Sequence, residues 1–282
     1  MSRFFKLQNV QTFFFSLKNK QQQKKEIQKS PQESKNLFQQ AQQLHKQNQF
    51  EEAIFYYSKS IKLDEKNIVP YFYMGHAYQK LQNHKQAIDC FQKYLENKPK
   101  ETATYKYIGQ SFLNMSNFES AIKCFLLALK SSPDDPLLYY NLAIAYEGQS
   151  EQKQNNEDID KAIMLYQKSI LLDKNLKESF NNLGSIYLQK KDYNQAIQNF
   201  EKAIEIDNSF SNAYFNLSQA YANQQKYQEA LIPLEKAKNL DPENGQIYYN
   251  LAFLYSKLDN EQKAKEYLEI SKQLLGQENE NQ

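Results

Sequence analysis

An internal repeat of 34 residues constrains the fold of this chain more than any other feature of its sequence. The period is clearest at an alanine, which recurs at Ala53, Ala87 and Ala121 and again at Ala162, Ala196, Ala230 and Ala264. The step from Ala121 to Ala162 is 41 residues, so one repeat carries seven extra residues. A fixed period of this length indicates stacked units, each of which contacts only its neighbours.

Each unit has the pattern of two helices, because its apolar residues recur at i, i+3, i+4 and i+7. Six Gly and seven Pro are too few to supply the turns of a sheet with many strands. An aromatic residue or Leu precedes the alanine at Leu37, Tyr71, Tyr105, Tyr139, Phe180, Tyr214 and Tyr248. A bulky residue follows it at Tyr57, Phe91, Phe125, Tyr166, Phe200, Leu234 and Leu268. Small residues, where two helices must approach closely, stand at Ala41, Gly75, Gly109, Ala143, Gly184, Ser218 and Ala252.

These positions resemble the tetratricopeptide repeat family, whose pattern is an aromatic residue, Leu-Gly, Tyr, then Ala, Phe, Ala and Pro. The resemblance covers residues 34–278 and comprises seven repeats. It implies an all-α fold in which antiparallel helix pairs stack into a right-handed superhelical solenoid. The first helix of each pair then lines a concave groove.

The same pattern predicts the domain boundaries. Residues 1–33 form an N-terminal arm with a polar linker, residues 34–278 the solenoid, and residues 279–282 a polar tail. The insertion falls in repeat four, residues 136–176, and we expect an exposed loop from Gly148 to Glu157, with Asp158 or Asp160 capping the next helix. Lys265 and Lys272 replace apolar residues of earlier repeats, and Gln40 does so at the other end, so both ends are predicted to be polar caps.

The first twenty residues contain five Phe and four basic residues but no acidic one. A mitochondrial transit peptide is basic, poor in acidic residues and amphipathic. Against that interpretation, the segment has one Arg and places Lys6 among apolar residues at helical spacing. A tail, or a hydrophobic arm that docks on a partner, is the alternative. The chain is accordingly expected inside the cell, in mitochondria on the first interpretation and in the cytoplasm on the second.

No pattern of catalytic or metal-binding residues is present, so we expect neither an enzyme nor a cofactor. The sequence has no phosphate-binding glycine loop, nucleophile elbow or metal-binding Cys/His spacing. Cys90 and Cys124 hold equivalent positions in successive repeats, so their spacing reflects the repeat and predicts two reduced thiols. A formal net charge of +2 does not favour a nucleic-acid partner. No apolar run is long enough to span a membrane.

The binding residues are expected on the first helices, directly after the aromatic position. The predicted groove residues are Phe72, Tyr73, Lys106, Tyr107, Tyr140, Asn141, Asn181, Asn182, Phe215, Asn216, Tyr249 and Asn250. Asn occupies one equivalent place in four successive repeats, and a side-chain amide both donates and accepts, so such a ladder can pair with the backbone of an extended peptide. This arrangement resembles the peptide-holding groove of O-linked N-acetylglucosamine transferase repeats. The alternative is that the amides only tie neighbouring helices together.

A second resemblance is largely rejected. Chaperone-binding repeats clamp a C-terminal carboxylate with Lys and Asn side chains from three successive repeats. Lys106 and Asn141 match, but Glu178 and Asn182 stand where a positive charge is needed. A carboxylate would be repelled there, so a chaperone adaptor is not expected.

Two functions remain open. The first is a scaffold or adaptor that binds extended protein segments in its groove. The second is a permanent structural subunit of a larger complex, which would use its convex face, its ends or its Phe-rich arm.

Overall fold

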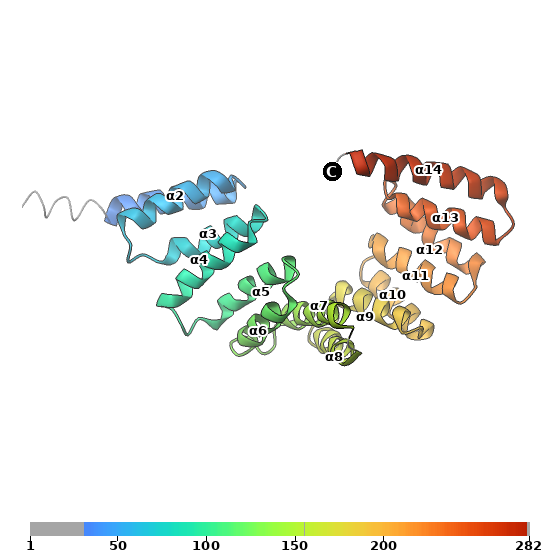
Figure 1. Ribbon diagram of the computed structural model, residues 1–282, viewed down its shortest axis with the longest axis horizontal. Helices are drawn as coiled ribbons and strands as arrows, with labels where there is room; N and C mark the ends of the chain where they lie inside the picture. Colours follow the sequence, from blue (N-terminus) through green and yellow to red (C-terminus); the bar gives the residue numbers. More distant parts are fainter. Residues whose placement is uncertain (1–30, 155, 281–282) are drawn as a thin grey trace, which may run out of the picture. The chain divides into compact units, whose positions relative to one another are not determined.

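The computed structural model describes residues 31–154 and 156–280, and within these ranges the chain forms helices and no strand. It divides into two compact units at Ser131 and Ser132 (Figure 1). Unit 1 refers below to the described residues up to Ser131, and unit 2 to those from Ser132 on.

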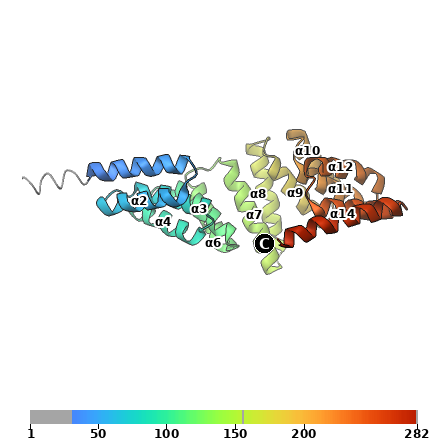
Figure 2. The ribbon, with the colours of Figure 1, turned by 90° about the horizontal axis from the view of Figure 1, so that it is seen from above.

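Unit 1 begins with a helix over residues 31–46, which lies beside α2 (Figure 2). The Ser34 hydroxyl donates to the carbonyl oxygen of Ser60 at 2.8 Å and fixes this first helix on α2. The following elements are α2 (Phe50–Leu63), α3 (Val69–Lys80), α4 (His84–Asn97), the short 3-10 helix η1 (Thr102–Thr104), α5 (Tyr105–Asn114) and α6 (Phe118–Leu129). Each helix packs on the next one along the chain, as a stack of helix pairs requires.

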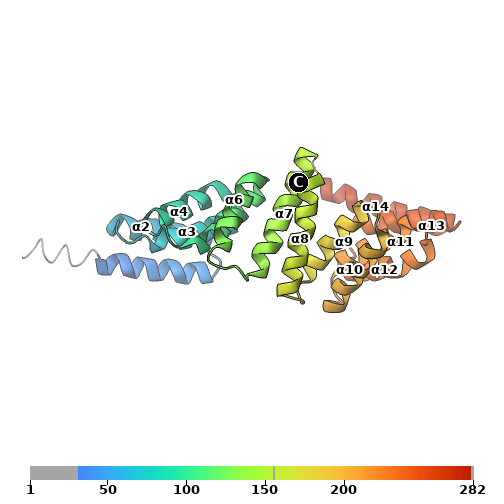
Figure 3. The same ribbon diagram turned by 90° about the horizontal axis from the view of Figure 1, so that it is seen from below.

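Unit 2 contains four further pairs, which Figure 3 shows from a second side. They are α7 (Pro136–Lys153) with α8 (Asn156–Leu172), α9 (Lys177–Gln189) with α10 (Tyr193–Ile206), α11 (Ser211–Asn223) with α12 (Tyr227–Leu240), and α13 (Gly245–Lys257) with α14 (Glu261–Glu280). Within each pair the two helices are in extensive contact, and each second helix also packs on the next first helix. These contacts confirm the predicted stacking of helix pairs within each unit.

The repeated positions form the core of both units. The alanine of the first six repeats is completely buried, whereas Ala264 in the last repeat is half-buried. The small residue of the first helix lies against the bulky residue of the second: a Cβ added at Gly184 would come within 2.7 Å of the Phe200 ring. The same distance separates such a Cβ at Gly75 from Phe91. Glycine is therefore required because the two helices leave no room for a methyl group.

The turn inside each repeat has the same backbone geometry and contains no glycine. One residue with a positive φ follows each first helix, at Asn48, Gln82, Ser116, Gln154, Lys191, Gln225 and Asp259. Apart from Gln154, these residues stand five positions before the repeated alanine. Left-handed backbone is unfavourable for most side chains, so the repeat tolerates a small local strain at this point.

The insertion of repeat four does not form the predicted loop. It lengthens α7 to 18 residues and α8 to 17, and Gln149 and Ser150 are buried at 8% and 9% exposure. Asp158 is 4% exposed inside α8 and pairs with Lys161 at 2.7 Å, so it does not cap the helix. The prediction was wrong because Glu, Gln and Lys, although polar, are strong helix formers and extend a helix that has already begun.

The predicted polar ends agree with the observed exposure. Gln40 is exposed in the first helix, and the side chains of Lys265 and Lys272 are 80% and 66% exposed on α14. The described part of that first helix, residues 31–46, includes three residues of the stretch predicted as linker. Residues 1–30, with most of the predicted arm, and the last residues of the tail lie outside the described residues. Among the helices that are described, none has the length and apolar character needed to cross a membrane.

Candidate functional site

In unit 1 the predicted groove residues form a cluster of rings on α3 and α5. The ring centroids of Phe72 and Tyr107 are 5.7 Å apart, and those of Phe72 and Tyr73 are also 5.7 Å apart. His76 lies between them, at 4.7 Å from Phe72 and 4.2 Å from Tyr107. The Lys106 ammonium lies 5.0 Å from the centre of the Tyr107 ring. The structure thus brings together all four predicted residues of this unit.

His76 carries no positive charge at neutral pH. Burial, with the positive charges of His45, Lys106 and Lys80, lowers the pKa of His76 to about 4. The ring therefore packs as an uncharged aromatic group among its neighbours. No group of three or more metal-ligating side chains is found in the described ranges.

The first repeat contains an unusual buried hydroxyl. In repeat four, the Tyr166 hydroxyl donates to Glu147 at 2.8 Å and accepts from Asn182 at 3.3 Å. Tyr57 is the equivalent residue in repeat one, where His45 replaces Glu147. Tyr57 is completely buried, and among the described residues neither its hydroxyl nor His45 Nδ1 has a hydrogen-bond partner. At this position of repeat one, the described residues thus make none of the hydrogen bonds that surround Tyr166 in unit 2.

Three asparagines of unit 2 are connected to one another through two hydrogen bonds. Asn216 Nδ2 donates to Asn181 Oδ1 at 2.9 Å, and Asn181 Nδ2 donates to Asn182 Oδ1 at 3.3 Å. Asn182 then continues the chain to the Tyr166 hydroxyl. Asn250 differs, because its amide donates to the carbonyl oxygen of Gln246 in its own helix, at 2.8 Å. Part of the amide ladder thus ties α9 to α11, the alternative that the sequence left open.

Two carboxylates stand close to Tyr140, on the same side as this chain. Burial raises the pKa of the Tyr140 hydroxyl, and the negative charges of Glu178 and Glu147 raise it further. Burial also raises the pKa of Glu147, against the hydrogen bond from Tyr166, which lowers it. The surroundings of Tyr140 are consequently negative and are suited to a cationic group.

At the other end of unit 2 an exposed phenylalanine stands between two hollows. The inner hollow, of about 300 Å³, is lined by Ser218, Gln219, Ala222, Asn223, Asn250, Phe253 and Leu254. The end hollow, of about 510 Å³, is lined by Tyr249, Ala252, Phe253, Ser256, Glu261, Ala264, Lys265 and Leu268. Phe253 borders both and is 44% exposed, and Tyr249 is 51% exposed. Large rings at this exposure leave apolar surface for a partner.

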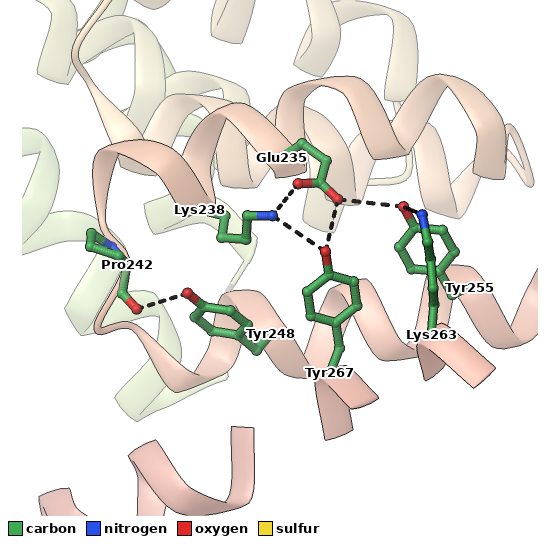
Figure 4. Close-up of polar contacts among 7 residues, drawn as sticks. All are labelled: Glu235, Lys238, Pro242, Tyr248, Tyr255, Lys263 and Tyr267. Carbon is green, nitrogen blue, oxygen red and sulfur yellow. Dashed lines mark hydrogen bonds and ion pairs between the residues drawn. The ribbon is translucent and has the colours of Figure 1, made fainter. Parts of the chain in front are cut away.

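A network of tyrosines holds α13, the helix that carries these rings (Figure 4). The Tyr255 and Tyr267 hydroxyls each donate to Glu235 Oε1 at 3.4 Å, and Lys238 pairs with the other oxygen of the same carboxylate. The Tyr255 and Tyr267 rings stack with centroids 5.6 Å apart. Since Glu235 lies on α12, Tyr255 on α13 and Tyr267 on α14, the network joins three helices and fixes the position of Phe253.

The two thiols are unsuited to nucleophilic chemistry. Burial, mainly, raises the pKa of Cys90 to about 12, and burial raises that of Cys124 to about 11. Both side chains are buried and reduced, so they remain protonated at neutral pH.

Family models decide the identity of the repeat. Three models of the tetratricopeptide repeat match residues 109–150 and 184–225, residues 211–244, and residues 245–269. The chain is a tetratricopeptide repeat protein. A model of subunit 3 of the anaphase-promoting complex, or cyclosome, matches residues 24–94. The comparison with curated proteins finds no match.

Solved tetratricopeptide repeat structures share the fold at low sequence identity. The C-terminal part of a repeat protein from Cytophaga hutchinsonii has 20% identity and a TM-score of 0.63, over 84% of this chain and 95% of that one. MamA from Desulfovibrio magneticus has 24% identity and a TM-score of 0.58, over 63% and 97%. A chain of the APC/C hetero-tetramer Cut9-Hcn1 has 19% identity and a TM-score of 0.63, over 83% and 45%. These likenesses concern the fold alone.

Two residues of unit 2 that lie beside the predicted groove residues, Phe253 and Glu147, were not predicted from the sequence. Phe253 stands five positions after the aromatic Tyr248, whereas the predicted groove residues take only the first two positions after each aromatic. The helical period gives the signal for Phe253, because a residue four positions after Tyr249 lies on the same side of α13. Glu147 gives no such signal, because the period does not reveal the hydrogen bond that the Tyr166 hydroxyl donates to it.

Proposed function

We propose that this tetratricopeptide repeat protein binds an extended segment of another protein along the first helices of unit 2, without catalysing a reaction. The surface concerned, called the unit 2 face below, carries Tyr140, Asn141, Glu147, Glu178, Asn182, Asn216, Tyr249, Asn250 and Phe253. The pair of hollows around Phe253 carries the proposal. They are lined by Tyr249 and Asn250, two of the residues predicted from sequence, and they offer space for apolar side chains.

The amides of this face keep hydrogen-bonding capacity for a ligand. An asparagine side chain has two N–H groups and an oxygen that can accept twice, and the bonds within the protein use part of that capacity. Asn216, for example, uses its donor side toward Asn181, while no bond to its oxygen is recorded among the described residues. Bonds to a peptide backbone there would contribute about 0.5–1.5 kcal/mol each.

The experiment is capture of cellular partners by the tagged full-length chain. Phe253→Ala should remove a subset of partners, because the ring offers a specific apolar contact. Phe55→Ala is the matched control, since Phe55 is another exposed phenylalanine, at 54%, but lies on α2 in unit 1. Identical losses in the two variants, with circular dichroism showing both folded, would contradict the proposal.

A permanent place in a larger complex is the second candidate function. Its specific support lies on second helices of unit 2, where Met164, Leu171 and Ile232 are 69%, 68% and 75% exposed. A hollow of about 830 Å³ beside Leu171 adds to this apolar surface. If the chain elutes from cell extract entirely in one large complex of fixed composition, the subunit role replaces the adaptor role.

A fusion of the first residues to a fluorescent protein tests where in the cell the chain is located. We expect a fluorescent protein fused to residues 1–33 to stay in the cytosol, because Lys6 interrupts the apolar face that a transit helix needs. Fluorescence in mitochondria would assign the transit function instead.

A further inference from the structure

The stacking of one repeat on the next follows a fixed pattern in unit 2. In repeat six, α12 presents three apolar residues to α13, namely Ala230, Leu234 and Ala237. Three residues of α13, spaced at i, i+4 and i+7 and at most 1% exposed, pack on them: Ile247, Leu251 and Leu254. In the same way, Leu183 and Ile186 of α9 form one cluster with Tyr166 of α8. Each first helix thus lays one apolar stripe on the pair before it.

The last repeat has the same surface, but no helix covers it among the described residues. In this last pair of unit 2 (Figure 3), the α14 residues equivalent to the first two of α12 are Ala264 and Leu268. Both are only half-buried, and both line the end hollow of about 510 Å³. Phe215 packs against the α13 cluster, whereas its equivalent in the last repeat, Tyr249, is 51% exposed. The end hollow therefore lies where a further first helix would stack.

A second copy of this chain is a poor occupant for that place. The helix over residues 31–46 precedes α2, and no pair before it covers its stripe in the part of the chain that the structure describes. Its three positions equivalent to the α13 stripe are polar and exposed: Asn36, Gln40 and Gln43. Amides laid on an apolar surface would lose their hydrogen bonds to water without replacement. The complementary stripe must come from another protein.

We propose that the end hollow binds an amphipathic helix of a partner protein, with Leu or Ile at i, i+4 and i+7 packed on Ala264 and Leu268. This inference rests on the proposed function, because the end hollow is one of the two hollows around Phe253; it specifies a helix as the part of the partner that enters there. Lys265 stands where the six earlier repeats have Ile or Leu. The docked helix therefore covers less apolar surface than an internal first helix does, and it binds reversibly.

A peptide copied from α13 is the probe, since α13 covers the equivalent surface of repeat six. It has the sequence of residues 245–257, a fluorescein label, and a side-chain cross-link between positions 249 and 253. These two positions lie on the opposite side of the helix from the apolar stripe. The cross-link is needed because an isolated helix of this length is marginal in water. Fluorescence anisotropy measures the binding of the peptide to the full-length chain.

Three variants of the full-length chain test the site. Ala264→Glu should weaken binding of the peptide by about tenfold or more, because it places a charge on the surface that the helix covers. Gln262→Glu, the matched control, adds the same charge at an exposed position of α14 outside the hollow and should leave binding unchanged. Lys265→Ile restores the side chain of earlier repeats and should tighten binding about fivefold, a gain that loss of folding cannot produce. Circular dichroism first confirms that the variants are folded.

The outcomes separate this inference from the proposed function. Absence of binding, or equal affinities for the parent chain, Ala264→Glu and Lys265→Ile, would overturn the helix proposal, while selective loss of partners in Phe253→Ala would still support the proposed function. If the peptide responds as expected but Phe253→Ala and Phe55→Ala lose the same partners, the proposed function fails by itself. Equally tight binding of a peptide with Ala252→Pro and no cross-link would overturn the helix in favour of an extended segment. Dimers of the parent chain in sedimentation velocity, abolished by Ala264→Glu, would overturn it in favour of a second copy.

Discussion

Gly184 shows how a single atom decides the spacing of two helices. An added methyl group there would stand 2.7 Å from the Phe200 ring, closer than side chains ever pack. Gly184→Ala should therefore lower the free energy of unfolding by about 1–3 kcal/mol. Gly276→Ala, with no heavy atom within 4 Å, is the matched control and should stabilise α14 by up to about 1 kcal/mol. Urea unfolding of the two variants measures both effects, and equal changes of the same sign would refute the packing argument.

His76 predicts a specific loss of stability in acid. Its pKa is about 4 in the folded chain and 6.5 in its unperturbed state, so protonation favours the unfolded chain. The stabilisation by neutral His76 is complete above pH 6.5 and is lost as the pH falls toward 4, by at most about 3 kcal/mol. His76→Gln should flatten this part of the stability profile. A profile as steep in His76→Gln as in the parent chain would show that other groups cause the loss.

The sequence predicts the residues of the candidate site only where their position within the repeat alone determines which residues surround them. The equivalence of Phe72 and Lys106 in successive repeats follows from the period, and both lie in the ring cluster of unit 1. The hydrogen bond from Asn216 to Asn181 depends on rotamers and helix spacing, which the period does not contain. The hollows beside Phe253 depend on which neighbouring side chains are small, and on the absence of a further repeat among the described residues.

At the scale of the helix, the turn inside each repeat offers a direct test of backbone strain. Lys191 and Asn48 occupy the same turn position with φ of 62° and 61°. Left-handed geometry costs most residues about 1–2 kcal/mol, but asparagine much less. Allowing for the extra freedom of glycine in the unfolded chain, Lys191→Gly should gain about 0.5 kcal/mol, and Asn48→Gly almost nothing. Thermal unfolding compares the two variants; an equal gain at both positions would contradict a strained lysine.

The helices themselves follow from the period, and the one wrong prediction, the loop in repeat four, has a local cause. The helical period of the apolar residues placed all fourteen expected helices, which the described residues contain, without the help of turn glycines, since the turns use non-glycine residues. In repeat four the same polar residues that signalled a loop continue α7 through Gln149 and Ser150. A sequence of strong helix formers does not reveal where a helix ends when no capping residue interrupts it.

At the scale of the whole molecule, α14 is expected to prevent association through its end of unit 2. Lys265 and Lys272 are exposed and each stands near a glutamate of the same helix, Glu261 at 3.4 Å and Glu269 at 4.0 Å. Changing both lysines to Ile should leave stability nearly unchanged but enlarge the apolar surface around the end hollow. Sedimentation velocity should then show concentration-dependent dimers. A double variant that stays monomeric at high concentration would mean that this end needs no polar cap.

The central claim is that the unit 2 face holds other protein segments, with amides giving general affinity and rings giving selection. The most direct measurement is a quantitative comparison of captured partners for three full-length chains: the parent, Phe253→Ala, and the fourfold variant Asn141→Ala, Asn182→Ala, Asn216→Ala, Asn250→Ala. Circular dichroism must first show that all three are folded. We expect the fourfold variant to weaken every partner of the face to a similar degree, and Phe253→Ala to weaken some far more than others. An unchanged set of partners in both variants would contradict the account and place the subunit role first.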